Sequence, residues 1–361
     1  MLFNLLTSLI DQYSFLNVFK YLTFRTGLSV VTSLVIVFLI GGPLIKIFSE
    51  NMITGPIRQD GPIDHIIKKS GTPTMGGVII IIGMLSSTLL WADLNNIYIW
   101  TLVFVSLSLG TLGFIDDLLK IKLKNSRGLN SKLKFLGQLI ISIIAILILA
   151  KFSEHEYLYN LYFPFFKNLI WDMGLFFIPF GLFVIIGSSN AVNLTDGLDG
   201  LATVPVMLVA LSFTLISYVV GNTIFSEYLK LQYIPDVGEL SIFCGSIVGS
   251  CLGFLWYNAP PAKIFMGDTG SLSLGGSLAA VAIIAKHEIV LAIIGGLFVL
   301  ETVSVIIQVI SFKLTGKRIF KMAPIHHHFE QKGWAESTIV IRFWIIAIIL
   351  ALVGLATLKL R

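Results

Sequence analysis

The chain has 361 residues, of which 56% are hydrophobic and only 12% are charged, and its mean hydropathy is +0.90. This composition excludes a soluble globular protein of average make-up and predicts a polytopic membrane protein. The net charge of +5 fits anionic lipid surfaces or anionic substrates, and the two cysteines, Cys244 and Cys251, lack metal-binding spacing and imply no disulfide framework.

Long apolar stretches recur along the chain. One crossing of a ~30 Å hydrocarbon core needs roughly 20 apolar residues, which predicts about ten transmembrane helices and an all-α fold. The predicted spans are 22–48, 73–91, 97–119, 135–150, 173–191, 198–221, 240–257, 271–285, 289–312 and 339–358. Residues 1–21 are mixed in character, lack the basic region of a cleaved signal peptide, and are expected to lie at the membrane interface. We expect a single domain over residues 1–361, with the bundle at 22–358.

The loops between these spans have an uneven charge distribution. If the spans alternate in direction, the loops at 49–72, 120–134, 192–197, 258–270 and 313–338 share one side, and they carry most of the lysines and arginines. The positive-inside rule then places them in the cytoplasm and both termini outside. The unusual polar residues also fall almost entirely on that side, which favours a surface site over a transporter with ionisable residues at mid-membrane.

The third predicted span ends with Asp116 and Asp117 among apolar neighbours. Adjacent helical residues point about 100° apart, so the two acids are expected to have different roles. Acids at a helix C-terminus meet the unfavourable end of the dipole, which predicts a compensating cation. The alternative is a charge pair with Lys120 or Lys122 at the membrane edge.

The segment from Asn190 to Gly200 places two carboxylates and two amides between apolar runs that carry no charge. A charged side chain near bilayer depth costs roughly 2.5–3.5 kcal/mol, so these carboxylates need a reason to be there. If the chain is helical from Leu194 onward, Asp196 and Asp199 lie on one face of that helix. The alternative is that Asn193 and Asp196 only cap and charge the next helix.

Asp268 follows Gly267 where the next span begins. Helix N-termini and glycine-rich turns suit phosphate groups, and a carboxylate there suits Mg²⁺ that bridges phosphates. Oxygen ligands from several aspartates favour Mg²⁺ or Mn²⁺ over zinc. The alternative is an ordinary turn.

Two further segments carry polar chemistry. Residues 326–328 are three histidines without a matching cysteine or second histidine cluster; if the segment is extended, His326 and His328 share a side and can bond phosphate or sugar oxygens. The stretch 68–77 has lysines, hydroxyls and glycines before a helix but lacks the P-loop order. For the histidines, the alternative is an interfacial polar loop. For residues 68–77, the alternative is that the polar residues only cap the start of the next helix. Glu301 and Gln308 lie on one face of the ninth span and should point into protein or a polar cleft.

Five motifs carry a resemblance to a known family. They read Gly-Thr-Pro-Thr-Met-Gly-Gly at 71–77, Phe-Ile-Asp-Asp-Leu-Leu-Lys at 114–120, Asn-Leu-Thr-Asp-Gly-Leu-Asp-Gly at 193–200, Phe-Met-Gly-Asp-Thr-Gly-Ser at 265–271 and Pro-Ile-His-His-His-Phe-Glu at 324–330. In this order the chain resembles the phospho-N-acetylmuramoyl-pentapeptide-transferases from about Thr54 to its C-terminus. The triple-histidine form resembles this branch of the polyprenyl-phosphate N-acetylhexosamine-1-phosphate transferases rather than the N-acetylglucosamine branches.

The resemblance implies transfer of phospho-MurNAc-pentapeptide from UDP-MurNAc-pentapeptide to undecaprenyl phosphate, with Mg²⁺ as the cofactor, in the bacterial plasma membrane with a cytoplasmic active site. It implies no nucleic-acid partner. Whether the protein forms a homodimer and which amino acid is third in the peptide stay open. Asp268 matches a metal ligand, and Phe265 matches a residue that packs against uracil. The implied catalytic residues are Asp116, Asp117, Asp268, His326 and His327, and the implied substrate-binding residues are Lys69, Thr74, Asn193, Asp196, Asp199, Asn258, Phe265 and His328.

This reaction does not need a strong general base from the enzyme. The acceptor is a phosphate monoester whose second pKa is about 6, so it is already mostly a nucleophile near neutral pH. We expect direct attack on the sugar-side phosphorus, with Asp116 or Asp117 positioning the acceptor or taking a residual proton. A two-step route through an aspartyl-phosphate is the mechanistic alternative. A related UDP-N-acetylhexosamine transferase and a secondary transporter are the alternative functions.

Overall fold

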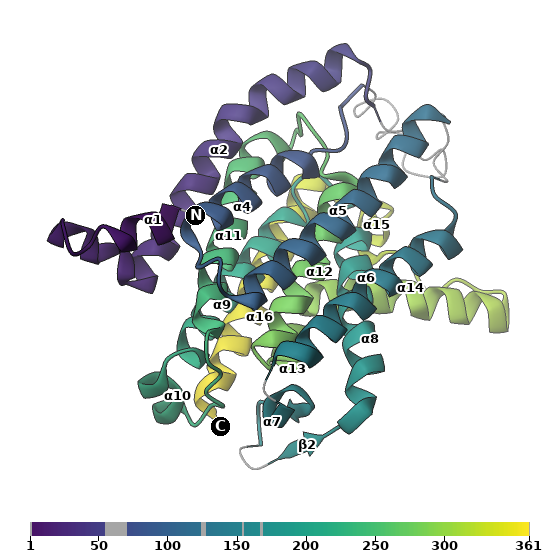
Figure 1. Ribbon diagram of the computed structural model, residues 1–361. Helices are drawn as coiled ribbons and strands as arrows, with labels where there is room; N and C mark the ends of the chain where they lie inside the picture. Colours follow the sequence, from purple (N-terminus) through teal and green to yellow (C-terminus); the bar gives the residue numbers. More distant parts are fainter. Residues whose placement is uncertain (1, 55–70, 124–127, 154, 167–168, 361) are drawn as a thin grey trace.

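The computed structural model describes residues 2–54, 71–123, 128–153, 155–166 and 169–360. This part of the chain is almost wholly helical (Figure 1). Its two strands are β1 (Asn160–Tyr162) and β2 (Ile170–Asp172), which pair antiparallel with Leu161 opposite Trp171. The all-α class predicted from composition is therefore confirmed.

Nine helices within the described residues are long and apolar enough to cross a membrane. They are α2 (Leu22–Glu50), α5 (Ile97–Lys122), α6 (Ser131–Phe152), α8 (Phe177–Thr195), α9 (Thr203–Val220), α11 (Leu240–Asn258), α12 (Gly267–Ile284), α14 (Gly296–Thr315) and α16 (Glu336–Leu360). A further apolar helix, α4 (Gly77–Trp91), has 15 residues, fewer than one crossing needs. A helix occurs at each of the ten predicted spans, and the crossing by α4 stays a prediction.

The remaining helices are short. They are α1 (Leu2–Ser8), α7 (His155–Leu158), α10 (Thr223–Leu229), α13 (Glu288–Ile294), α15 (Ile325–Glu330) and the 3₁₀ helices η1 (Ser14–Lys20), η2 (Gly174–Phe176) and η3 (Val237–Glu239). The interfacial position expected for residues 1–21 falls on α1 and η1 and stays a prediction.

The structure corrects several of the predicted span bounds. The ninth span was expected to be continuous from 289 to 312, but it divides into α13 and α14 at Gly295. Figure 1 shows α14 extending away from the bundle. The second span starts at Gly77 rather than 73, and the sixth starts at Thr203 rather than 198, because the preceding residues form turns and loop contacts. Apolar character alone does not mark where a helix begins or breaks.

Helix α12 lies at the centre of the bundle (Figure 1) and packs against α5, α8, α4 and α9. Nearly all of its residues are buried, and its sequence is rich in glycine, serine and alanine. Small side chains let neighbouring helices approach closely, and hydroxyls can bond between them. Ser106 and Ser277 hydroxyls lie 2.7 Å apart, and Ser273 donates to the carbonyl of Ser106 at 2.8 Å. Because α12 begins at Gly267, this packing fixes the position of Asp268.

The described parts of the five loops expected on one side of the membrane meet at one end of the bundle. Thr74 N–H donates to the carbonyl of Ile53, and Phe265 N–H donates to the carbonyl of Pro73. The loop after α5 reaches back through the Leu129 N–H, which donates to Asp116. The other contacts are Ala262 N–H to Asp199, and the His326 ring against Gly197. The expected clustering of the polar loops is therefore confirmed.

Close approach of α5 to α12 depends on Gly113. A Cβ atom at this position would lie 2.5 Å from the carbonyl carbon of Asp268 and 2.7 Å from the nitrogen of Thr269. Backbone atoms cannot yield as a flexible side chain does. Gly113 therefore lets the end of α5 contact the first turn of α12.

We expect Gly113→Ala to destabilise the protein by about 1–3 kcal/mol, because the added methyl group forces α5 away from α12. The measurement is the thermal unfolding midpoint of the purified protein in detergent. Gly187→Ala is the matched control, since a Cβ there meets nothing within 4 Å and alanine favours a helix by roughly 0.5–1 kcal/mol. Equal midpoints for the two variants would contradict the close-packing argument.

Candidate active site

Three aspartates from two helices form a cluster where the polar loops meet. Asp116 and Asp117 lie near the C-terminal end of α5 and are almost fully buried, and Asp268 lies in the first turn of α12. One carboxylate oxygen from each aspartate lies within 4.8 Å of the others. The structure thus brings together the three acids that the sequence placed in separate motifs.

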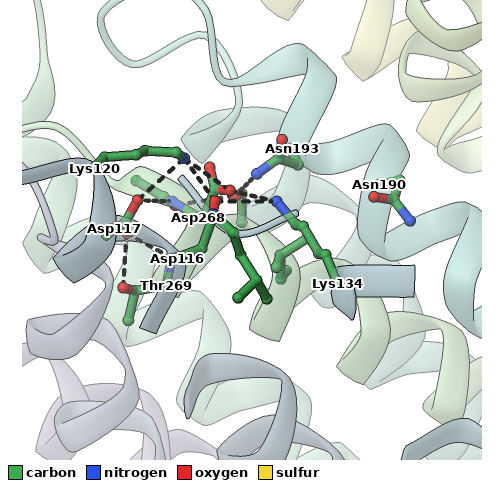
Figure 2. Close-up of polar contacts among 12 residues, drawn as sticks. Asp116, Asp117, Lys120, Lys134, Asn190, Asn193, Asp268 and Thr269 are labelled. Atoms are coloured by element: carbon green, nitrogen blue, oxygen red, sulfur yellow. Dashed lines mark hydrogen bonds and ion pairs between the residues drawn. The ribbon is translucent and has the colours of Figure 1, made fainter. Parts of the chain in front are cut away.

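Two lysines contribute positive charge to this cluster. Lys120 Nζ lies 2.8 Å from Asp116 Oδ2 and 3.0 Å from Asp268 Oδ2. Lys134 Nζ lies 2.5 Å from Asp268 Oδ2 and 3.4 Å from Asp116 Oδ2. Figure 2 shows the two ammonium groups approaching Asp268 from opposite sides. The opposite charges offset the repulsion among three buried carboxylates.

The sequence predicted the position of one of these lysines at the acid cluster but not that of the other. Lys120 lies one turn after Asp116 on α5, so the expected compensating cation is present. Sequence reasoning missed Lys134, which lies in the first turn of α6 and which only helix packing brings to Asp268. Its sole signal was membership of the basic loop at 120–134.

Asp117 has different contacts from its neighbour. It accepts hydrogen bonds from Asp268 N–H at 3.3 Å, Thr269 N–H at 3.0 Å and the Thr269 hydroxyl at 2.8 Å. Free N–H groups and the positive end of the dipole at a helix N-terminus favour such a carboxylate. Asp117 therefore anchors the start of α12 and lies 3.6 Å from Lys120 Nζ, whereas Asp116 contacts both lysines and accepts from Leu129 N–H.

The turn between α8 and α9 holds two more predicted residues. Helix α8 ends at Thr195 and α9 begins at Thr203, so Asp196 and Asp199 do not share a helical face as expected. The cause is the turn at 196–202, in which Gly200 has φ +71°, a left-handed conformation that favours glycine. Asp199 accepts from Ala262 N–H at 2.9 Å, and its own N–H donates to Glu336 Oε1 at 3.0 Å.

Asp196 faces the start of α12 from this turn. Gly267 N–H donates to its carboxylate, but burial and the negative charges of Asp268 and Asp117 raise the pKa of Asp196 to about 7. Such a carboxyl exchanges a proton near neutral pH and senses the charge of the cluster. One turn earlier, Asn193 Nδ2 donates to the Ser271 hydroxyl of α12 at 2.9 Å.

The segment 73–77 lies against residues 265–267. Gly76 N–H donates to the carbonyl of Phe265 at 2.8 Å, which fixes the backbone of Phe265. Thr74 Oγ1 lies beside Gly267, where φ is +73° and an added Cβ would meet the hydroxyl at 3.1 Å. Thr74 therefore borders the acid cluster, as its predicted role requires. Lys69 lies outside the described residues.

Asn258 is a buried residue at the end of α11. Its Nδ2 donates to the carbonyl of Ile264 at 2.9 Å, and its Oδ1 accepts from the Thr203 hydroxyl at 2.8 Å. Both ends of the amide thus bond to protein. These bonds hold the loop that leads to Asp268. Asn258 therefore stabilises the backbone next to the acid cluster.

The histidine motif is helical, not extended as expected. Residues Ile325–Glu330 form α15, so His326 and His328 do not share a side. His326 is fully buried, with Nδ1 at 3.1 Å from Glu301 Oε2 and its ring against Gly197. His327 Nδ1 lies 2.6 Å from Glu330 Oε2, and His328 Nδ1 accepts from Lys321 N–H. His326 therefore contacts the aspartate turn at Gly197.

Glu301 and Gln308 of α14 both face protein, as expected. Glu301 is fully buried beside His326. Gln308 donates to the carbonyl of Phe320 at 2.9 Å and accepts from the N–H groups of Ile319 and Phe320. Helix α14 thus orients His326 and holds the loop that leads to α15.

Clustered acids and partly exposed lysines at one end of an apolar helical bundle fit a polytopic membrane protein with a site for anionic groups. Comparison with known proteins agrees with this class. Residues 99–286 match the model for glycosyl transferase family 4, and residues 69–81 match signature 1 of phospho-N-acetylmuramoyl-pentapeptide-transferase.

Curated proteins similar to the whole chain narrow the class. The chain is 69% identical to phospho-N-acetylmuramoyl-pentapeptide-transferase of Pelagibacter ubique (strain HTCC1062), 58% to that of Rickettsia prowazekii (strain Madrid E) and 53% to that of Maricaulis maris (strain MCS10), in each case over 100% of both chains. The chain therefore belongs to the phospho-N-acetylmuramoyl-pentapeptide-transferase family, and it is a transferase.

The raised pKa of Asp196 predicts a pH-dependent stability. An unfolded aspartate has a pKa of about 3.9, so between that pH and about 7 the folded state binds the extra proton and stability falls as pH rises. Asp196→Asn keeps the shape and removes the charge. We expect its thermal midpoint relative to wild type to be higher at pH 8 than at pH 5, measured in EDTA. A difference that does not grow with pH contradicts this prediction.

Proposed function

We propose that this protein transfers phospho-MurNAc-pentapeptide from UDP-MurNAc-pentapeptide to undecaprenyl phosphate, which releases UMP and forms lipid I in the first membrane step of peptidoglycan synthesis. The main structural support for this proposal is the cluster that Asp116, Asp117 and Asp268 form with two lysines. Full-length relatives of the chain bear the name of this enzyme.

The reaction must bring two anions together. The donor carries a pyrophosphate, and the acceptor is a phosphate monoester that is mostly dianionic near neutral pH. Lys120 and Lys134 place two ammonium groups at Asp268, with side chains that are 23% and 18% exposed. Positive groups in a partly desolvated site stabilise phosphoryl charge more than they would in water. The lysines therefore offset the repulsion between the two substrates.

The acid cluster also fits a divalent cation. Three carboxylate oxygens within 4.8 Å form a hard oxygen donor set, which suits Mg²⁺ or Mn²⁺ rather than zinc. Asp268 would be the principal ligand, with Asp116 beside it. A bound Mg²⁺ would neutralise the pyrophosphate and the departing UMP.

The contacts of the two neighbouring aspartates favour distinct roles. Asp117 accepts three hydrogen bonds from the start of α12, so we assign it to holding Asp268 in place. Asp116, which faces both lysines, is placed to position the acceptor phosphate or take its residual proton. A lone pair of the acceptor oxygen forms the new P–O bond, and the bonding electrons of the broken P–O bond leave with UMP. This direct route needs no phosphorylated aspartate.

An apolar groove of about 300 Å³ lies between α8, α12, α13 and α14. Ser188, Ala191 and Val192 of its lining lie just before Asn193, and Gly275 lies two turns beyond Asp268. The groove thus begins within one turn of Asn193 and runs along α8 and α14, which are mostly unburied within the bundle. We place the isoprenoid chain of the acceptor in this groove, with its phosphate directed toward the acid cluster.

The remaining motif residues frame the nucleotide-sugar side. Thr74 borders Gly267, and Phe265 is fixed through its backbone at the same edge, consistent with the proposed contact to uracil. His326 contacts the 196–200 turn from the opposite edge, and we assign His327 and His328 to substrate contacts beyond it. The site faces the cytoplasm in this proposal, because the basic loop at 120–134 supplies its lysines.

The test of the function is UMP release by the purified protein with undecaprenyl phosphate, Mg²⁺ and one of two donors. We expect release with UDP-MurNAc-pentapeptide and at least about 100-fold slower release with UDP-N-acetylglucosamine, because a site built to bond a donor group rejects analogues that lack it. The reverse preference would favour a related N-acetylhexosamine transferase. Absence of release with either donor would exclude both readings.

Asp268→Asn should lower kcat for UMP release by roughly 100-fold or more, because it removes a charged oxygen from the cation and from both lysines. Mn²⁺ binding followed by electron paramagnetic resonance should weaken in parallel. Asp172→Asn is the matched control, since Asp172 is exposed in β2 outside the described acid cluster. Near-normal turnover and Mn²⁺ binding in Asp268→Asn would remove Asp268 from the metal site.

A further inference from the structure

Gln138 is a buried amide that none of the sequence motifs contains. It lies on α6 one turn after Lys134, and only 2% of its surface is exposed. Its Oε1 accepts a hydrogen bond from Asn190 Nδ2 at 3.0 Å, across the packing of α6 against α8. Its Nε2 has no hydrogen-bond partner among the described residues. A buried polar group with this geometry needs an explanation beyond packing.

The amide of Asn190 has a fixed orientation. Its Nδ2 also donates to the carbonyl of Ile186 at 2.8 Å, so both of its hydrogens have acceptors. A backbone carbonyl can only accept, and therefore the nitrogen must lie on the side of Ile186 and Gln138. Figure 2 shows the consequence, because the Asn190 oxygen is turned toward the acid cluster and the nitrogen away from it.

Asn190 also occupies a defined place at the site. It lies one turn before Asn193, which bonds to Ser271 of α12, and on the same side of α8 as that residue. Asn190 is partly exposed, whereas Gln138 is buried. Asn190 can therefore contact a substrate, and Gln138 can act only through Asn190.

We infer that Gln138 is a positioning residue that holds Asn190 Oδ1 toward the bound donor substrate as a hydrogen-bond acceptor. The group it accepts from is an N–H or O–H of the donor substrate, since phosphate oxygens are themselves acceptors and repel it. The ammonium of Lys134 is already held by Asp268 and Asp116. This inference rests on the proposed function and adds a determinant of donor binding.

An apolar residue at position 138 would leave one Asn190 hydrogen without an acceptor. The amide could then rotate and present its nitrogen to the substrate, which turns an attraction into a donor–donor conflict. A glutamate at 138 has nearly the same shape as glutamine and keeps an oxygen acceptor for Asn190. Leucine and glutamate variants therefore separate the hydrogen bond from the volume of the side chain.

The experiment measures UMP release as a function of each substrate. For Gln138→Leu we expect KM for UDP-MurNAc-pentapeptide to rise about 10-fold, with kcat and KM for undecaprenyl phosphate within about 2-fold of wild type. Gln138→Glu should restore KM to within about 3-fold. Ser142→Ala is the matched control, because Ser142 is equally buried one turn further along α6 and bonds only to the carbonyl of Gln138.

A double-mutant cycle tests whether Gln138 acts through Asn190. In an Asn190→Ala background, Gln138→Leu should change KM for the donor by less than 2-fold, since the positioned oxygen is gone. An equal effect in both backgrounds, a rise in KM for the lipid instead, or no effect of Gln138→Leu overturns the inference. If Gln138→Leu does not fold, as judged by its thermal midpoint, Gln138→Met replaces it.

The controls separate this inference from the proposed function. Wild-type protein that releases no UMP from UDP-MurNAc-pentapeptide defeats the proposed function. Wild-type protein that does so, together with Gln138 variants that behave like wild type, defeats only the role of Gln138.

Discussion

The contact between the C-terminal end of α5 and the N-terminus of α12 determines the rest of the site. Asp117 accepts the first N–H groups of α12, and Gly113 allows the two backbones to touch. Asp268 is thereby held beside Asp116, at the end of the most buried helix of the bundle. An acid at a helix C-terminus meets an unfavourable dipole, but here the favourable end of a second helix and the lysines compensate for it.

The two faces of α8 connect the polar and apolar halves of the molecule. Asn190 and Asn193 lie on the side of α6 and α12, whereas Ser188, Ala191 and Val192 line the groove shared with α14. Helix α14 has a similar double role, since Glu301 contacts His326 and neighbouring residues line the groove. A reaction between a water-soluble nucleotide sugar and a membrane lipid needs this juxtaposition, because neither substrate can leave its own phase.

Much of the fold was predictable because hydrophobic length is a local property. A helix occurs at each of the ten predicted spans, and the polar loops meet at one end as charge and parity indicated. Predictions that assumed a local conformation failed. The histidine motif is helical rather than extended, Asp196 and Asp199 lie in a turn rather than on one helical face, and the ninth span breaks at Gly295. Glycine and proline positions and tertiary contacts decide such details, and apolar length does not reveal them.

The sequence by itself determined the membrane class, the family motifs and the acids of the site, because residue types and their order encode transfer free energy and ligand chemistry directly. It also indicated Lys120, which lies one helical turn from Asp116. Only the tertiary structure decided that Lys134 reaches Asp268, that Asp117 anchors α12, and that Gln138 fixes the amide of Asn190. These contacts join different helices, and their geometry depends on how closely small residues let those helices pack, which no local sequence pattern specifies.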